Sequence, residues 1–292
     1  MNLINNCGEI TTMPDGVNYV LEPGKLYNLN YNYRSGYPYL EDGGVLSIPK
    51  KVYSTEEDNM LSNMVLNHFK KDNKKTTGVL LDGLKGSGKT MMSKMIANKA
   101  GVPIIAVSGN YRTNRLHEFF DKVDVPVCIM FDEIDKNKEY WETEDLLTFL
   151  DGLQQQEKRL VMMTCNNTNN MSQYILNRCS RVLYYKYYKE IGYGIIWQIA
   201  NDLLSDTKTN NEIDEISNFI HNKFSVVSYD NVISFLQECA TYPKYDYKNI
   251  VKFLNITLKE DDDDKEDKDN DTVEIKDTDE ESDNVIPEDL GF

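Results

Sequence analysis

The feature that most constrains this chain is one segment that fits the pattern G-x-x-x-x-G-K-[ST]: Gly83-Leu84-Lys85-Gly86-Ser87-Gly88-Lys89-Thr90. In this pattern a glycine-rich turn lets backbone N–H groups converge on a phosphate group. The short apolar run Val79-Leu80-Leu81 precedes the segment, and a helical pattern that stops at Gly101 follows it. A buried strand, a glycine loop and a helix N-terminus are together the parts that a phosphate site requires. The alternative is a glycine turn that binds no ligand.

Two side chains of this segment have predicted roles in the binding of a nucleoside triphosphate. Lys89 can reach the β- and γ-phosphates, and the hydroxyl group of Thr90 can ligate Mg²⁺. The helix that begins there adds about half a positive charge on the same side. We therefore expect this segment to bind a nucleotide together with Mg²⁺.

A second segment, Val125–Phe131, is almost continuously apolar and is followed by Asp132 and Glu133. A strand that is apolar on both faces is typical of the centre of a parallel sheet. The two carboxylates would then lie at the C-terminal end of this strand, where open parallel sheets bind their ligands. We expect Asp132 to hold Mg²⁺ and Glu133 to take a proton from an attacking water. An exposed acidic turn without a ligand is the alternative.

Hydrophobic periodicity divides the chain into four predicted parts. Residues 1–50 form a small β-rich element, residues 51–187 alternate strands and helices, residues 188–258 are helical, and residues 259–292 are an acidic tail. The fold class that follows is α/β. It combines a P-loop NTPase core built on a parallel sheet with a C-terminal helical lid, a small β-rich N-terminal element and a disordered acidic tail.

Finer expectations accompany this division. We expect helices over 56–70 and 141–155, and strands over 159–165 and 182–185. Six tyrosines lie between Tyr19 and Tyr39. They belong either to a half-buried hairpin that covers a neighbouring surface or to a docking face for a substrate or partner.

The charge of the chain is concentrated at one end. The net charge is −16, and the stretch from Lys259 to Phe292 holds 17 acidic and 4 basic residues. This stretch is either a solvating tail or, because Val285–Phe292 is more apolar, a docking peptide. The chain as a whole is not a basic nucleic-acid binder, although a local basic strip stays open. Scattered cysteines and the lack of an 18-residue apolar run predict a cytoplasmic protein that does not enter a membrane.

The residues quoted above resemble the AAA+ ATPases. The similarity covers roughly Val52–Ala240. Within the family, the chain is most like the compact AAA-family ATPases of large tailed bacteriophages. Order and spacing both agree with that family. The matching segments are Gly78–Thr90, Phe131-Asp132-Glu133-Ile134-Asp135, Leu146–Gly152, Cys165-Asn166 and the pair Arg178 and Arg181.

This resemblance implies a site, a ligand and an assembly. The ligand is ATP with Mg²⁺, and Asn166 is the sensor that orients the attacking water, with Asn167 as the second choice. Arg178 and Arg181 act in trans as arginine fingers on a neighbour's ATP, and the alternative is that they are surface arginines paired with acids. Fingers that act in trans imply a ring, for which the family expectation is a homo-hexamer.

The predicted activity is a Mg²⁺-dependent ATPase whose ring remodels a protein or protein complex. No arginine follows Arg181, which favours the protein-remodelling branch of the family, although a lysine such as Lys223 could replace a lid arginine. Tyr111, or Tyr140 with Trp141, is a candidate pore residue or a packed surface aromatic. The alternatives are a DNA-metabolism motor or loader that acts on nucleic acid, and a scaffold protein that binds ATP with little turnover.

Overall fold

The computed structural model describes residues 2–6, 9–13, 20–32, 34–71, 76–108, 113–137, 149–151, 157–168 and 178–259. The chain divides into two compact units, Met1–Thr257 and Leu258–Phe292, and the elements below all belong to the first. Some of the predicted features lie outside the described ranges: the acidic tail beyond Lys259, most of the helix expected over 141–155, and the pore candidates Tyr111, Tyr140 and Trp141.

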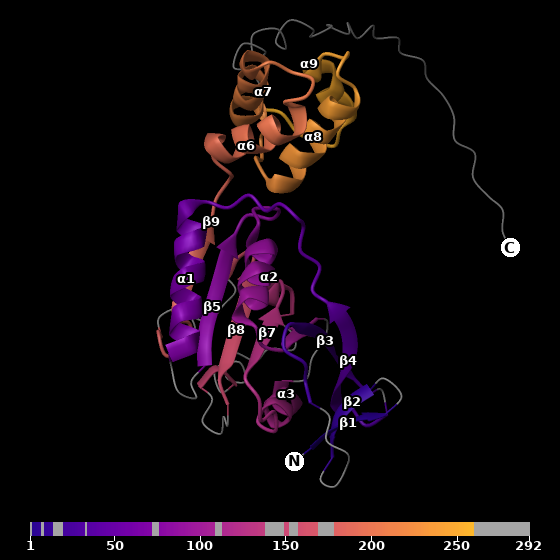
Figure 1. The fold of residues 1–292 in the computed structure, drawn as a ribbon, viewed down its shortest axis with the longest axis vertical. Coiled ribbons are helices and arrows are strands. Elements are labelled where there is room, and N and C mark those ends of the chain that lie inside the picture. The colour runs from indigo at the N-terminus through magenta and orange to yellow at the C-terminus, as the bar shows by residue number, and fades with distance from the viewer. Residues whose placement is uncertain are drawn as a thin grey trace, which may run out of the picture. The chain divides into compact units, whose positions relative to one another are not determined.

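The first unit is built on one sheet of nine strands (Figure 1), in the order β1-β2-β4-β3-β6-β7-β8-β5-β9. The bounds are β1 (Asn2–Asn6), β2 (Glu9–Met13), β3 (Lys25–Tyr31), β4 (Pro38–Val45), β5 (Thr76–Gly83), β6 (Ile104–Val107), β7 (Val127–Phe131), β8 (Arg159–Cys165) and β9 (Tyr184–Tyr188). Strands β6, β7, β8, β5 and β9 are parallel, which confirms the predicted α/β fold with a parallel sheet.

The N-terminal strands extend this sheet rather than stand apart from it. β3 pairs in parallel with β6, with Leu26 opposite Ile104, and β4 then pairs antiparallel with β3. Tyr27 and Leu29 of β3 are buried in the core of the unit. The tyrosine-rich segment thus contributes at least one ring to the interior, where its burial stabilises the junction of β3 and β6.

Helices cover both faces of the sheet because alternate residues of each buried strand point to opposite sides. On one face, α1 (Glu56–Lys71) and α2 (Lys89–Ala100) pack on Val79, Leu81 and Met162. On the other face, α3 (Thr113–Phe120) and the helical residues Phe149 and Leu150 pack on Leu80, Ile129 and Met163. The result is a three-layer core whose strands end on a common edge.

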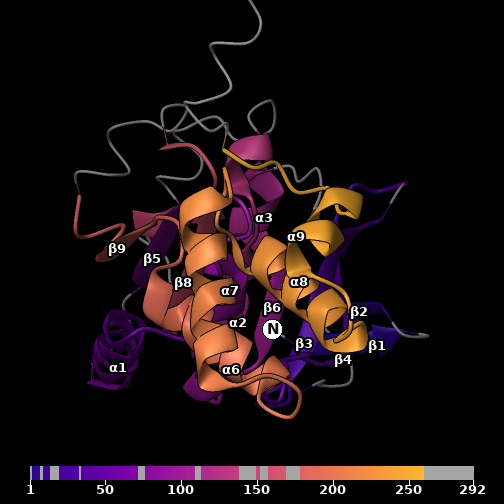
Figure 2. The same ribbon diagram turned by 90° about the horizontal axis from the view of Figure 1, so that it is seen from above.

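The C-terminal helices have a hydrophobic core of their own. They are α6 (Tyr193–Leu204), α7 (Asn210–Lys223), α8 (Tyr229–Thr241), α9 (Tyr247–Ile250) and the 3₁₀ turn η3 (Val251–Phe253). α6 lies against both α7 and α8 (Figure 2). No helix within the described ranges is long and apolar enough to cross a membrane.

The final strand begins later than predicted. The sequence pattern indicates a strand over 182–185, whereas β9 spans Tyr184–Tyr188. The cause is a turn before it, in which the backbone N–H groups of Arg181 and Val182 donate to the Arg178 carbonyl at 2.9 and 3.1 Å. β9 ends at the buried residue Tyr188, whose carbonyl oxygen accepts a hydrogen bond from the Leu84 N–H at 3.0 Å.

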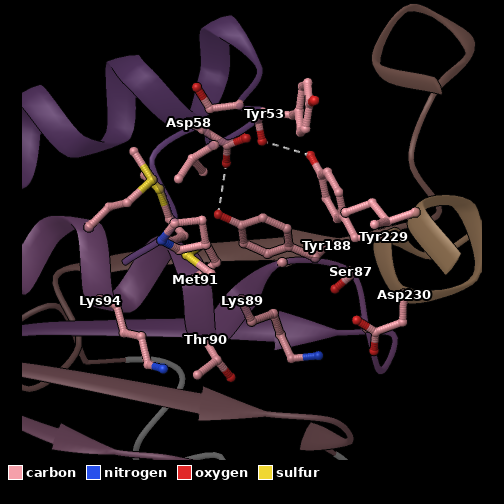
Figure 3. A pocket seen from close by; sticks show the side chains of 18 of the residues that line it. Tyr53, Asp58, Ser87, Lys89, Thr90, Met91, Lys94, Tyr188, Tyr229 and Asp230 are labelled. Carbon is pink, nitrogen blue, oxygen red and sulfur yellow. Dashed lines mark hydrogen bonds between the residues drawn. The ribbon is translucent and has the colours of Figure 1, made fainter. Parts of the chain in front are cut away.

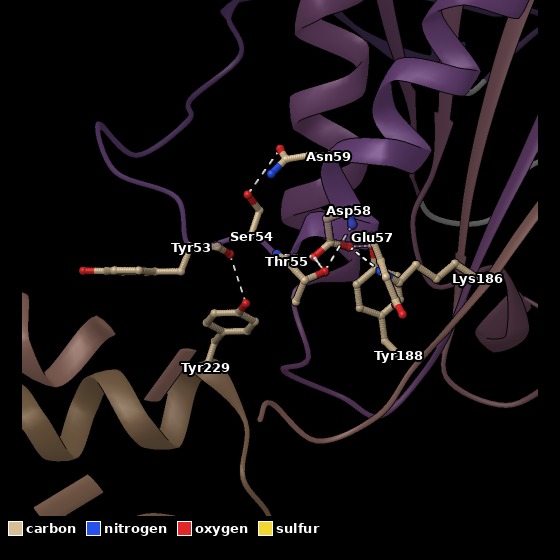
Figure 4. A network of polar contacts seen from close by, with 9 residues as sticks. All are labelled: Tyr53, Ser54, Thr55, Glu57, Asp58, Asn59, Lys186, Tyr188 and Tyr229. Carbon is tan, nitrogen blue, oxygen red and sulfur yellow. Dashed lines mark hydrogen bonds and ion pairs between the residues drawn. The ribbon is translucent and has the colours of Figure 1, made fainter. Parts of the chain in front are cut away.

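A buried carboxylate ties the start of α1 to the end of β9 (Figure 4). Asp58 Oδ2 accepts hydrogen bonds from the Thr55 backbone N–H and hydroxyl group at 2.9 and 2.8 Å. The Asp58 backbone N–H donates in return to Thr55 Oγ1 at 3.1 Å, which caps α1. Asp58 Oδ1 accepts from Lys186 Nζ and from the Tyr188 hydroxyl group, both at 2.8 Å. Burial acts to raise the pKa of Asp58, but the hydrogen bonds from Lys186, Thr55 and Tyr188 outweigh it and lower that pKa.

We expect Asp58→Asn to lower the free energy of unfolding by about 2–4 kcal/mol at neutral pH, because Lys186 loses a buried counter-charge. The folded-state pKa of Asp58 lies below its unfolded value. Its contribution is therefore present above the unfolded pKa and is lost as the pH falls through the folded pKa. Denaturant titrations should show the difference between variant and wild type shrinking below about pH 4.

Glu57→Gln is the matched control, since it removes a neighbouring carboxylate that is 85% exposed and lies farther from Lys186, at 3.5 Å. It should cost less than about 1 kcal/mol. Equal losses in the two variants would contradict the role of Asp58.

Candidate active site

The backbone of the segment Gly83–Thr90, called here the phosphate-binding loop, depends on glycine. β5 ends at Gly83 and α2 begins at Lys89, with Gly88 as its N-cap. The φ angles of Gly83, Gly86 and Gly88 are 126°, 73° and 97°, a region that L side chains rarely adopt. A Cβ on Gly83 would also lie 2.0 Å from the Tyr188 carbonyl oxygen. The loop therefore fits only because its glycines have no side chain.

Lys89 lies in the interior of this loop. It is 6% exposed, and its Nζ donates to the Gly83 and Leu84 carbonyl oxygens at 2.7 and 2.6 Å. Burial lowers the pKa of Lys89, against the attraction of nearby carboxylates such as Asp82. Ser87 Oγ is buried without a hydrogen-bond partner among the described residues. A buried cation and an unsatisfied hydroxyl group in one loop fit a phosphate ligand.

A pair of oxygen-bearing side chains lies beside the loop. Thr90 Oγ1 donates to Asp132 Oδ1 at 2.9 Å, and Thr164 Oγ1 donates to the same oxygen at 2.6 Å. No group of three or more His, Cys, Asp or Glu side chains that could hold a metal occurs in the part of the chain that the structure describes. Hydroxyl and carboxylate oxygens fit Mg²⁺, which is usually completed by water and phosphate oxygens rather than by a full set of protein ligands.

Glu133 and Asn166 form the second polar pair. Asn166 Nδ2 donates to Glu133 Oε1 at 3.0 Å, and Lys136 Nζ forms an ion pair with Glu133 Oε2. These contacts, that of Lys136 first, lower the pKa of Glu133 although partial burial opposes them. Glu133 has a φ of 50°, and its N–H donates to Thr164 Oγ1 at 2.8 Å. The turn after β7 thus aims the carboxylate at the end of β8.

The two predicted arginine fingers have different surroundings. Arg178 is exposed in the turn before β9. Arg181 is 7% exposed, and its Nε and Nη2 donate to the two carboxylate oxygens of Asp151, both at 2.7 Å. This ion pair lowers the pKa of Asp151. A finger role for Arg181 would require the ion pair to break, whereas Arg178 is already accessible. The roles of both arginines stay predictions.

A cavity of about 760 Å³ joins these groups to the C-terminal helices (Figure 3). This volume falls in the range of about 300–1,000 Å³ that is typical of small-molecule sites. Lys89, Thr90, Asp132, Glu133 and Asn166 all line it, so the structure brings these predicted residues together. Apolar and aromatic side chains form another part of the lining, called here the apolar end: Val52, Tyr53, Ile199, Leu203 and Ile233.

Sequence reasoning did not single out several residues of this cavity, among them Tyr53, Tyr229 and Asp230. The available signals were local. Tyr53 precedes the capping residues of α1, and Ser228 is a typical N-cap ahead of the helical pattern of α8. Those signals predict where the helices begin, but they do not reveal that both helix starts border one cavity.

Part of the chain is similar to a known protein family. Residues 79–187 match the family model described as "ATPase family associated with various cellular activities (AAA)". This range holds the whole phosphate-binding loop, both carboxylates, Asn166 and the two arginines. This part of the chain is therefore similar to that ATPase family.

Curated relatives that match by sequence include ATP-dependent zinc metalloproteases. FtsH of Lactococcus lactis is 30% identical over 117 residues, which is 32% of this chain and 17% of that protein. FTSH 11 of Arabidopsis thaliana is 33% identical over 108 residues, which is 30% of this chain and 13% of that protein. The chain thus spans less than a fifth of the length of these relatives.

Similarity to a solved structure supports the fold and only the fold. A RuvB mutant of Thermogota maritima superposes with a TM-score of 0.52 at 16% identity, over 70% of this chain and 71% of that one. At this identity the likeness concerns the arrangement of the sheet and helices. It agrees with the P-loop NTPase core that the sequence predicts.

We expect Gly83→Ala to prevent the loop from forming, because its Cβ would collide with the Tyr188 carbonyl group. The free energy of unfolding should fall by at least about 3 kcal/mol, measured by denaturant titration. Gly101→Ala is the control, since Gly101 also has a positive φ of 69° but nothing within 4 Å of a Cβ. It should cost only about 1–2 kcal/mol. Equal losses would show that the collision does not matter.

Proposed function

We propose that this chain binds ATP with Mg²⁺, hydrolyses it in a ring of identical subunits, and thereby remodels a protein or protein complex. The observation that carries the proposal is the meeting of two polar pairs beside the phosphate-binding loop. Thr90 and Asp132 suit a magnesium ion. Glu133 and Asn166 suit an attacking water. The similarity of residues 79–187 to the AAA ATPase family supports the same activity.

Each group in the site has a distinct proposed role. Lys89 and the N–H groups of the loop bind the phosphates, and bound Mg²⁺ would neutralise charge on the β- and γ-phosphate oxygens. Glu133 accepts a proton from water, which must first reach a carboxylate oxygen that Lys136 or Asn166 now occupies. Asn166 holds that carboxylate in place. The apolar end of the cavity, with Tyr53, suits a purine base.

The composition of the cavity lining supports a ring of subunits. The described residues that line the cavity include lysines but no arginine. A guanidinium suits the transferred phosphate because it remains charged and can contact two oxygens at once. Arg178, exposed in its turn, is our first candidate to complete a neighbour's site. Arg181 is the second candidate, because it must first leave Asp151. The resemblance implies six subunits.

A protein substrate is favoured over nucleic acid. The relatives are named as ATP-dependent metalloproteases, which links ATP use to action on proteins in those relatives. The net charge of −16 disfavours nucleic acid, whose phosphates are bound mainly through lysine and arginine. A DNA motor, the alternative, would show salt-sensitive stimulation of turnover by DNA. The finer similarity to ATPases of large tailed bacteriophages remains part of this proposal.

We expect Glu133→Gln to bind ATP with unchanged affinity but to lose about 10²–10⁴-fold in kcat, because glutamine cannot accept the proton. Calorimetry and a phosphate-release assay measure the two quantities. Lys89→Ala is the companion variant and should lose ATP binding itself. Full turnover by Glu133→Gln would refute Glu133 as the base, and binding without turnover in the wild type would favour a scaffold protein.

We expect Arg178→Ala to bind ATP but to lose turnover, because it cannot complete the site of its neighbour. Lys89→Ala subunits have intact arginines but bind no ATP. A mixture of the two variants should therefore regain part of the activity, while each variant alone stays inactive. A turnover assay at several mixing ratios tests this, and a mixture without regained activity would contradict action in trans.

A further inference from the structure

The first turn of α8 is fastened to the phosphate-binding loop. The Tyr229 N–H donates to the Gly86 carbonyl oxygen at 2.9 Å, and the Tyr229 hydroxyl group donates to the Tyr53 carbonyl oxygen at 3.0 Å (Figures 3 and 4). A Cβ on Gly88 would lie 3.1 Å from the Tyr229 ring. Tyr229 therefore holds the helix start against the loop on one side and against the segment before α1 on the other.

The next residue, Asp230, brings a negative charge to the phosphate end of the cavity. Its Oδ2 would lie 3.2 Å from a Cβ on Gly86, so its carboxylate borders the phosphate-binding loop (Figure 3). Asp230 is exposed and lines the cavity. The structure records no ion pair for it among the described residues. Its charge therefore faces the space that the phosphates would fill.

The helix itself does not cancel this charge. The N-terminus of a helix carries the equivalent of about half a positive charge, which is smaller than the full charge of a carboxylate. The first N–H groups of α8 are also engaged: that of Tyr229 by Gly86, and that of Asn231 by Ser228 Oγ at 3.2 Å. The first turn of α8 thus presents net negative charge to the loop.

We propose that Asp230 weakens the binding of polyphosphates and promotes release of α8 from the loop once phosphates are bound. The inference rests on the proposed function, since it concerns the same phosphate site. Without a ligand, the neutral contacts of Tyr229 keep α8 in place. With a ligand, repulsion between Asp230 and the phosphates opposes those contacts. Repulsion by the bound phosphates therefore pushes Asp230, and with it α8, away from the loop. This movement makes product release easier.

The test compares Asp230→Asn with the wild type by calorimetry, with AMP and ADP as probes. The variant should bind ADP roughly three- to tenfold more tightly at about 0.05 M salt, and the gain should be smaller for AMP, which carries less charge. At about 0.5 M salt the gain should shrink towards one, because salt screens the repulsion. A purely structural role for Asp230 would not produce a gain that depends on phosphate charge and salt.

Glu215→Gln is the matched control, because it removes one negative charge from α7, away from the cavity lining. It should leave ADP affinity unchanged. Asp230→Ser, which is also compatible with a helix start, replaces Asp230→Asn if that variant does not fold. Equal or weaker ADP binding by the Asp230 variant overturns the inference alone. Absence of ADP binding by the wild type overturns the inference and the proposed function together.

Discussion

The backbone carbonyl group of Tyr188 holds the phosphate-binding loop where it turns away from the sheet. It accepts a hydrogen bond from the Leu84 N–H at 3.0 Å, and it approaches Gly83 so closely that no side chain fits there. The hydroxyl group of the same tyrosine donates to buried Asp58. The position of the loop therefore depends on β9, and the position of β9 depends on a carboxylate at the start of α1. A local sequence motif acquires its shape from residues far from it in the chain.

The site residues that the sequence could predict lie within short patterns. The loop is a set of consecutive residues, and Asp132 and Glu133 follow a strand that is apolar on both faces. The strand expected over 159–165 coincides with β8, since an apolar run of this short length favours a buried strand over a helix. Parallel strands then bring these ends to one edge of the sheet, where Asn166 Nδ2 lies 3.0 Å from Glu133 Oε1. For these residues, the short sequence pattern reflects the same burial that determines where they lie.

The remaining contacts could not be predicted, because a local sequence pattern does not show which distant residue a side chain will contact. Asp58 resembles any capping residue at the start of a helix, and only the fold shows that Lys186 and Tyr188 meet it. Arg181 has the spacing of an arginine finger, yet Asp151 binds its guanidinium at two points. Polar side chains of this kind acquire their role from neighbours that are distant in sequence. The charge that Asp230 places beside the loop belongs to the same class.

Nucleotide affinity at this site depends on the hydrogen bonds that a phosphate forms and on those that it must first replace. Lys89 already donates to two carbonyl groups of the loop, so a phosphate must replace hydrogen bonds to a cation that are each worth about 1.5–3 kcal/mol. The net binding free energy must then come from the loop N–H groups and from the apolar end of the cavity. Repulsion by Asp230 reduces it further. A motor that turns over must release its product, and a site whose phosphate interactions are partly replaced and partly opposed suits release better than one built for the tightest binding.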